Sequence, residues 1–249
     1  MDLELAGKVA LVTGSSKGIG RQIAATLKEE GCLVIINGRG REALEQTAAE
    51  LGASAVSGDV SNPAGAAAVV EQAAALHRQL DIVVCNVGSG ASVAPGQEDG
   101  SEWQRMLQIN LLATTHTVAA ARPHLRAGGG VFLCISSICG SAALGAPIAY
   151  SAAKAALNSF VRGSARYLAN EKIRINALSP GNILFEGSTW ERKLATMPDQ
   201  VASLLKSEVA LGRLGTAEEV ASMAAFLCST RASYATGAVF VLDGGQLRS

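Results

Sequence analysis

Several features that mark large functional classes are scarce in this sequence. Aromatic residues make up only 4% of the 249 residues, and 21 Lys and Arg balance 21 Asp and Glu. A chain with no net charge offers no cationic surface to nucleic acid or to an anionic membrane. Scarce aromatics also argue against a stacking platform for single strands. No uncharged apolar run reaches about 18 residues, so we expect no membrane span.

Cysteine and histidine are too few and too scattered for a disulfide framework or a metal site. The five cysteines are odd in number and lack paired spacing, which predicts reduced thiols. With no recognisable secretory signal, this usage favours a cytoplasmic protein. Cys85 and Cys134 lie in apolar runs, where buried packing is expected. The three histidines show no metal-ligand spacing, so no metal is expected.

Glycine is abundant, with 27 residues, and short apolar runs alternate with Ala- and Leu-rich helical stretches. Runs without apolar/polar alternation predict strands covered on both faces. Together they predict an α/β fold with a doubly wound parallel seven-stranded sheet and helices on both faces. The expected strands are 8–13, 32–37, 54–57, 82–86, 131–136, 173–178 and 239–242. The expected helices are about 18–30, 41–51, 63–79, 100–127, 150–170 and 217–229.

One segment, 181–215, separates two expected strands by more than a simple crossover needs. Long insertions in compact domains are often lids or binding loops. We therefore expect a substrate lid at 184–212, with an ordinary surface pair of helices as the alternative. The chain contains no linker, repeat or low-complexity tract, which favours a single dinucleotide-binding and catalytic domain over 1–249.

The first strand runs into a glycine-rich turn, Thr13-Gly14-Ser15-Ser16-Lys17-Gly18-Ile19-Gly20, and a helix follows. Gly14 permits a sharp turn, Gly18 allows the backbone to approach a pyrophosphate, and Gly20 allows close helix packing. Free N–H groups and the helix dipole favour an anion there. The spacing differs from the common dinucleotide fingerprint and lacks the Gly-Lys-Ser/Thr of a triphosphate-binding loop.

The second strand ends at Asn37-Gly38-Arg39, where NAD-binding folds often carry a ribose-binding acid. Lys17 and Arg39 supply two cations instead, which favours the 2′-phosphate of NADP(H), with NAD(H) as the alternative. Arg39 as a solvated loop residue is the simpler interpretation. Asp59, after the third strand, is a candidate acceptor for the adenine amino group or the cap of a turn.

Tyr150 and Lys154 lie four residues apart at the start of an expected helix and so share one face. A free tyrosine has a pKa of about 10, and a nearby ammonium or a cationic nicotinamide lowers it. Such a phenol can exchange a proton with an alkoxide or an alcohol. Ser136 and Ser137 end the preceding strand, where a hydroxyl would face a ligand crevice.

Taken together these motifs, spread over the whole chain, resemble the short-chain dehydrogenase/reductase family. The resemblance implies a Rossmann-like domain with strand order 3-2-1-4-5-6-7 and a homotetramer. It implies that Tyr150 is the general acid/base and that Lys154 binds the nicotinamide ribose and lowers the Tyr150 pKa. The spacing to Tyr150 selects Ser137 to orient the substrate carbonyl. Asn110 would hold a water that links Lys154 to solvent.

The resemblance also implies a cofactor site along the strand ends, with backbone groups of Ile183 facing the nicotinamide amide. The cofactor-binding residues expected in all are Gly14, Ser16, Lys17, Gly18, Ile19, Gly20, Arg39, Asp59, Val60, Asn86, Gly88, Tyr150, Lys154, Pro180, Gly181 and Ile183. The substrate residues expected are Ser137, Tyr150, Phe185 and Trp190.

Two positions depart from the family pattern. Val87 adds bulk beside the cofactor where the family commonly has Ala, and Phe185 replaces a Thr whose hydroxyl Ser188 or Thr189 would have to supply. The segments 212–215 and 239–245 look like those of 3-oxoacyl-acyl-carrier-protein reductases, though a binding patch for the carrier protein does not follow. Alternatives are an NAD(P)-dependent dehydrogenase of a polyol, sterol or aromatic alcohol, and a non-catalytic nucleotide-binding sensor or scaffold.

Overall fold

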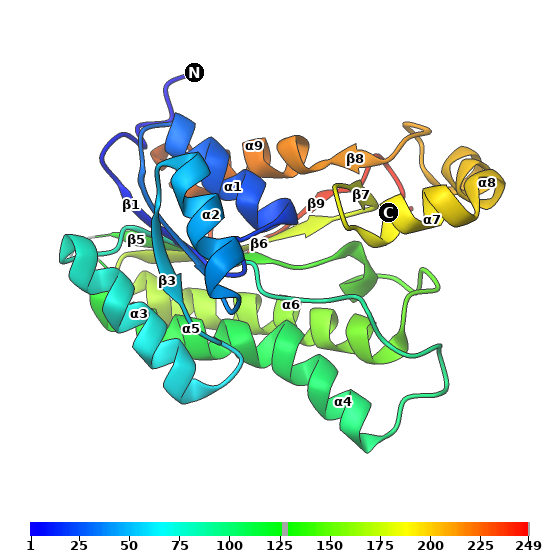
Figure 1. Cartoon of the computed structure of the whole chain (residues 1–249), viewed down its shortest axis with the longest axis horizontal. Coiled ribbons are helices and arrows are strands. Elements are labelled where there is room, and N and C mark those ends of the chain that lie inside the picture. The colour runs from blue at the N-terminus through cyan, green and yellow to red at the C-terminus, as the bar shows by residue number, and fades with distance from the viewer. Residues whose placement is uncertain (126–128, 249) are drawn as a thin grey trace.

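The computed structural model describes residues 1–125 and 129–248. A parallel seven-stranded sheet with the order β3-β2-β1-β4-β5-β6-β9 runs through its centre (Figure 1). This order confirms the predicted fold class and topology. The strands are β1 (Val9–Val12), β2 (Leu33–Gly38), β3 (Ser54–Ser57), β4 (Ile82–Cys85), β5 (Gly130–Ile135), β6 (Ile173–Pro180) and β9 (Val239–Leu242).

Helices cover both faces of the sheet (Figure 1). One layer consists of α1 (Gly18–Glu29), α2 (Arg41–Leu51) and α9 (Ala217–Cys228). The other consists of α3 (Pro63–His77), α5 (Ala113–Ala121) and α6 (Ile148–Ala169). Side chains of β1 alternate between the layers: Val9 and Leu11 join the core under α3, α5 and α6, whereas Ala10 and Val12 join the other core. Burial on both faces explains why these strands are uniformly apolar.

The region predicted to be helical at 100–127 is helical without a break from 100 to 124, but it is not a single regular α-helix. It consists of α4 (Gly100–Leu107), a π-turn (Gln108–Leu112), α5 and a short 3-10 turn (Arg122–His124). Residues 126–127 of the prediction lie outside the described residues. A π-turn has no distinct apolar spacing, so periodicity alone could not reveal it.

The long segment after β6 contains two helices, α7 (Thr189–Thr196) and α8 (Pro198–Glu208). A small parallel pair, β7 (Ile183–Leu184) with β8 (Gly215–Thr216), holds its two ends together. Figure 1 shows α7 and α8 projecting beyond the sheet. The segment therefore has the form of a helical pair fastened at its base.

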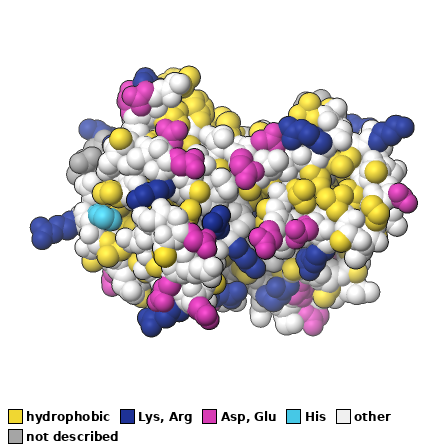
Figure 2. Space-filling model, turned by 45° about the horizontal axis from the view of Figure 1, so that its top comes forward, with side chains coloured by type: hydrophobic (Ala, Val, Ile, Leu, Met, Phe, Trp, Pro, Cys, Tyr) yellow, Lys and Arg dark blue, Asp and Glu magenta, His cyan; other side chains and the backbone are white. Residues whose placement is uncertain are grey.

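Within residues 1–125 and 129–248, no helix is long and apolar enough to cross a membrane. Figure 2 shows cationic and anionic side chains interspersed over the face it presents, with hydrophobic side chains gathered on the right, the side of α7 and α8. All five cysteines are free, and Cys85 and Cys134 are buried as predicted.

Candidate active site

A cavity of about 460 Å³ opens at the carboxyl ends of β1, β4, β5 and β6, where the strand order reverses. Ligands of open parallel sheets bind at this kind of position. Most predicted site residues line it. They are Gly14, Lys17, Gly18, Ile19, Gly20, Asn86, Gly88, Ser137, Tyr150, Lys154, Pro180, Gly181, Ile183, Phe185 and Trp190.

The remaining predicted residues stand outside the cavity wall. Ser16 lies beside Gly38, Val60 is packed in the core, and Asn110 is fully buried. Arg39 is exposed after β2, and Asp59 is partly buried after β3. The side chain of Val60 therefore cannot reach a ligand, and only its backbone could.

The side-chain amide of Asn86 stabilises the glycine-rich turn through hydrogen bonds. Its Nδ2 donates to the carbonyl oxygens of Thr13 at 3.2 Å and Gly14 at 2.8 Å. A side chain at Gly20 would collide with this amide and with the Gly14 carbonyl, which explains the glycine there. Asn86 thus shapes the turn, while the start of α1 directs its free N–H groups toward the cavity.

The ends of β2 and β3 are joined next to the expected adenosine side of the site. Asn37 Nδ2 donates to the carbonyls of Val56 at 3.0 Å and Gly58 at 3.1 Å. Asp59 accepts from the Ser61 N–H at 2.9 Å, as a turn cap would. Burial raises its pKa, but hydrogen bonds from Ser61 and the charge of Arg39 outweigh that, so the pKa is lowered. The charge of Arg39 therefore acts on the Asp59 carboxylate, which the sequence did not indicate.

The carboxyl end of β5 is where three predicted side chains lie close together, those of Ser137, Tyr150 and Lys154. Lys154 is 3% exposed and its Nζ donates to the Ile135 carbonyl at 2.8 Å, 6.0 Å from the centre of the Tyr150 ring. The Ser137 hydroxyl lies close enough to the Tyr150 phenol to lower its pKa. Ser136 instead donates to Asn158 at 2.6 Å. Of the two adjacent hydroxyls, Ser137 is the one that meets the phenol.

The protonation of this group differs from the sequence-based expectation. Burial raises the pKa of Tyr150 to about 12, against the lowering effect of the Ser137 hydrogen bond. Burial also lowers the pKa of Lys154 to about 8. The expected lowering of the Tyr150 pKa is thus not seen in the protein alone, because desolvation dominates and the ammonium is directed at Ile135.

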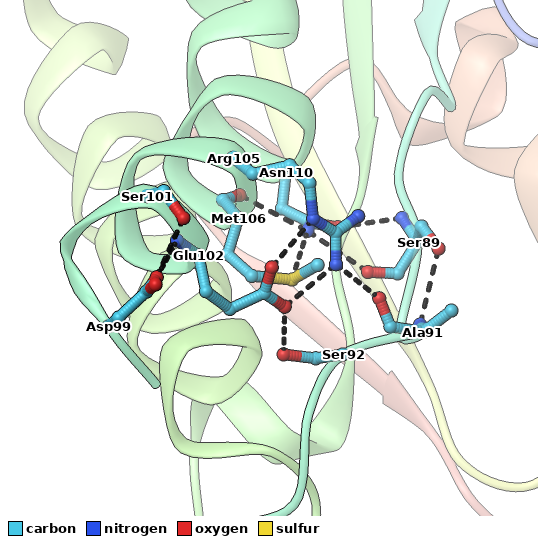
Figure 3. A network of polar contacts seen from close by, with 9 residues as sticks. All are labelled: Ser89, Ala91, Ser92, Asp99, Ser101, Glu102, Arg105, Met106 and Asn110. Atoms are coloured by element: carbon cyan, nitrogen blue, oxygen red, sulfur yellow. Dashed lines mark hydrogen bonds and ion pairs between the residues drawn. The ribbon is translucent and has the colours of Figure 1, made fainter. Parts of the chain in front are cut away.

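Asn110 lies in the π-turn and is satisfied within the protein (Figure 3). Its Oδ1 accepts from the Ser89 N–H at 2.9 Å, and its Nδ2 donates to Ser89 O at 3.0 Å and Met106 O at 3.2 Å. In a regular α-helix that Met106 carbonyl would accept from the Asn110 backbone N–H. A side chain at Gly88 would meet both Asn110 Oδ1 and Lys154 Nζ, so Gly88 lies between them.

A second contact fixes the same loop, and no sequence pattern indicated it. Arg105 Nη2 donates to the Ala91 carbonyl at 2.8 Å and to Glu102, which also accepts from Ser92 (Figure 3). An Arg and a Glu three residues apart ordinarily indicate no more than a surface ion pair. Here they attach the loop to α4, and between Ser89 and Ala91 the loop passes Tyr150 at Gly90.

Phe185 packs across the glycine-rich turn. A Cβ at Gly18 would lie 2.7 Å from Phe185 Cε2. Ser188, suggested as a replacement hydroxyl, accepts from the Glu191 N–H at 3.0 Å as the cap of α7. Thr189 is exposed, and its Oγ1 accepts a hydrogen bond from Arg192 Nη2 at 3.3 Å. Ser188 can still donate its own proton into the cavity, which it lines.

Two polar atoms in the cavity wall support a ligand with both donors and acceptors. Asn182 Nδ2 and Gln246 Oε1 are buried without a partner among the described residues. Buried polar groups are normally paired, so these atoms fit an amide or hydroxyl supplied by a ligand. No group of His, Cys, Asp and Glu in the described part of the chain could hold a metal.

Comparison with known proteins agrees with this geometry. A family model described as Enoyl-(Acyl carrier protein) reductase matches residues 14–246. The chain is 35% identical to a rhamnolipids biosynthesis 3-oxoacyl-acyl-carrier-protein reductase of Pseudomonas aeruginosa, covering 97% of this chain and 96% of the other. It is 32% identical to a 2-dehydro-3-deoxy-L-rhamnonate dehydrogenase (NAD(+)) of Sphingomonas, covering 97% and 96%. L-Sorbose reductase from Gluconobacter frateurii, solved with NADPH and L-sorbose, superimposes with a TM-score of 0.93 at 31% identity over 100% of both chains.

Fold, cavity and matches define an oxidoreductase that acts on CH–OH and C=O groups with a nicotinamide cofactor. The chain belongs to the short-chain dehydrogenase/reductase family and resembles its 3-oxoacyl-acyl-carrier-protein reductases.

Proposed function

We propose that this protein reversibly transfers hydride between NADP(H) and a carbonyl or secondary alcohol, with Tyr150 as the proton donor and acceptor. The observation that carries the proposal is the meeting of Tyr150, Ser137 and Lys154 in the cavity that also holds the glycine-rich turn. A buried phenol with a pKa near 12 is protonated at neutral pH, which suits the reductive direction. The cofactor, when bound, supplies or accepts the hydride.

The chain's own residues divide the remaining work. Ser137 would orient the carbonyl oxygen beside the phenol, with which it lines the same cavity. Lys154 would hold the nicotinamide ribose. Asn110 keeps Ser89 in place and so fixes the wall next to Gly88, while a water held in this region would connect Lys154 to solvent. Asn182 and Gln246 would satisfy ligand polar groups, together with the backbone of Ile183.

NADP(H) is the cofactor we favour. Lys17 lines the cavity at the start of α1, and Arg39 follows β2, so two cations flank the site expected for a 2′-phosphate. The L-sorbose reductase relative was solved with NADPH, whereas the rhamnonate dehydrogenase relative is named for NAD(+). The negative charge of Asp59, which interacts with Arg39, would oppose a 2′-phosphate, so NAD(H) is the alternative cofactor.

The substrate we favour is a small carbonyl compound such as a 3-oxoacyl thioester, following the relative from Pseudomonas aeruginosa. The named substrates of the other two relatives, a sugar acid derivative and L-sorbose, support dehydrogenation of a polyol as the alternative. A sterol or aromatic alcohol would also fit the apolar wall formed by Phe185 and Trp190. A sensor or scaffold without turnover would have no use for the reactive side chains of Tyr150, Ser137 and Lys154 in the cavity.

Further parts of the proposal concern organisation. The chain forms one domain, and 184–212 acts as a lid because Phe185, Trp190 and Leu204 line the cavity from that segment. The family resemblance supports a homotetramer, and the free cysteines favour a cytoplasmic location. An acyl-carrier protein would be a partner only if the substrate is a 3-oxoacyl thioester carried on it.

Initial rates with NADPH and NADH against a panel of 3-oxoacyl thioesters, ketoses, steroid ketones and aromatic ketones test the function. We expect consumption of NADPH to exceed that of NADH by at least about tenfold, since a charge-assisted phosphate contact contributes that much. Nucleotide binding without consumption of any carbonyl would establish the sensor alternative instead.

A further inference from the structure

The charged residues of the cavity wall are all cations. In the described part of the chain the wall contains Lys17, Lys154 and Lys193 and no Asp or Glu. The first belongs to the glycine-rich turn and the second to the group around Tyr150. Lys193 comes from α7, and neither the proposed hydride transfer nor the cofactor assignment uses it.

Lys193 is held within this wall without a counter-ion. No ion pair joins it to the rest of residues 1–125 and 129–248. Its Nζ lies 4.7 Å from the centre of the Trp190 ring, one helical turn earlier, in a cation–π contact. The side chain is partly buried. A partly desolvated ammonium gains most from a negative charge brought by a ligand.

The residues around Lys193 indicate what the rest of that ligand would be. Trp190, Leu204 and Leu144 line the same cavity and offer apolar surface. Consider a molecule that places its carbonyl at Tyr150 and an apolar stretch against these residues. If its far end is anionic, that end would reach Lys193 on α7.

We propose that Lys193 and Trp190 form a subsite for a negatively charged group of the substrate, so that the natural substrate is an anionic carbonyl compound. The inference rests on the proposed reductase function and narrows its substrate class. The shared chemistry is an anion attached to an apolar body. Its source is the carboxylate of an oxo acid or the phosphate of a pantetheine-linked thioester.

The cofactor is the competing explanation for Lys193, since it also carries phosphates. In the proposed cofactor site the free N–H groups at the start of α1 would serve the pyrophosphate, and Lys17 with Arg39 would serve the 2′-phosphate. Lys193 lies on the lid helix beside Trp190, so we assign it to substrate.

The test uses the full-length enzyme with saturating NADPH and a series of methyl ketones from 4-oxopentanoate to 8-oxononanoate, each beside its primary amide. A second pair, 3-oxobutanoyl-CoA and the N-acetylcysteamine thioester, distinguishes phosphate from carboxylate as the source. We expect kcat/KM for the anionic member of at least one pair to exceed that of its neutral partner by about tenfold. In Lys193→Met that ratio should fall close to one, and Lys193→Arg should keep most of it.

Lys206→Met is the matched control, because Lys206 is exposed on α8 and does not line the cavity. It should leave the ratio as in the wild type. Equal rates for charged and neutral partners in the wild type, or an unchanged ratio in Lys193→Met, would overturn the inference alone. A rise of about tenfold in the NADPH Kd of Lys193→Met would assign the lysine to the cofactor and also overturn the inference. If no carbonyl is reduced at all, the proposed function itself fails.

Discussion

Asn110 and Ser89 exchange two hydrogen bonds, one in each direction, at 2.9 and 3.0 Å. The pair joins the π-turn to the loop after β4, with Gly88 between it and Lys154. Asn110→Leu would leave the Ser89 N–H and two carbonyls without partners in a fully buried place, so we expect the free energy of unfolding to fall by about 3 kcal/mol. Urea denaturation measures it, with the exposed Asn170→Ala as control. A loss no larger than in the control would mean that the pair does not hold this region.

Arg105 holds the loop that passes Tyr150, through the Ala91 carbonyl and Glu102. We expect Arg105→Met to raise the KM for a carbonyl substrate severalfold, because the wall at Gly90 loses its anchor. The Kd of NADPH and the melting temperature should change little, since exposed ion pairs contribute little to stability. Steady-state kinetics with a fluorescence titration of NADPH separates these quantities.

Arg41→Met is the control for Arg105, because Arg41 forms an exposed ion pair with Glu45 on α2. If both variants show the same kinetics as the wild type, Arg105 has no positioning role.

Phe185 and Gly18 should be energetically coupled. Gly18 has a φ of +59° and leaves no room for a Cβ against the Phe185 ring. Gly18→Ala therefore carries both backbone strain and overlap in the wild type, but only strain, about 1–2 kcal/mol, in Phe185→Ala. We expect an interaction energy of about 1 kcal/mol from a double-mutant cycle of urea denaturation.

Gly52→Ala provides the reference for strain without overlap. Gly52 has a φ of +60°, and its Cβ would meet only Lys28 Cε at 3.8 Å. Additive effects at Gly18 and Phe185 would show that the ring does not rest on the turn in solution.

Lys154 should impose a pH dependence on stability. Its pKa falls from 10.5 to about 8 on burial, so the unfolded chain keeps a proton that the folded protein loses in this window. The contribution of Lys154 to the free energy of unfolding should therefore rise with pH from about 8 toward 10.5, and its destabilisation of about 3 kcal/mol is present in full below pH 8. Burial raises the pKa of the Cys32 and Cys228 thiols. The pKa of the Cys85 thiol is raised by its hydrogen bond with Cys134 and by burial. These three thiols act in the opposite direction over this range. The lysine contribution is therefore measured as a difference from a variant without it. Urea denaturation is measured from about pH 7.5 to 9.5 in steps of about half a pH unit. This range lies below the pH at which tyrosine in the unfolded chain titrates.

The comparison is with Lys154→Met, which removes only the lysine contribution. The free energy of unfolding of the wild type should therefore increase relative to that of the variant as the pH rises. An identical slope in both proteins would mean that Lys154 titrates in the folded protein as it does in the unfolded chain.

The sheet could be predicted from the sequence because its strands are short, apolar and bounded by turns. The cavity residues followed from motifs whose spacing reflects backbone geometry, as with Tyr150 and Lys154 on one helix face. Other features depend on contacts between distant segments. The π-turn, the approach of Phe185 to Gly18 and the attachment of Ala91 to Arg105 have no local pattern. The pKa of Tyr150 was misjudged for a related reason, because desolvation depends on the whole surrounding shell.

The central claim is that Tyr150 exchanges the proton in hydride transfer, and Tyr150→Phe tests it most directly. The variant keeps the ring and removes the hydroxyl, which lies in the cavity together with Ser137. With the best carbonyl substrate and NADPH, we expect kcat to fall by about 10²–10⁴-fold. The Kd of NADPH should stay within about twofold of the wild type, because the cofactor's other contacts remain. Near-normal turnover in Tyr150→Phe with unchanged NADPH binding would contradict the account.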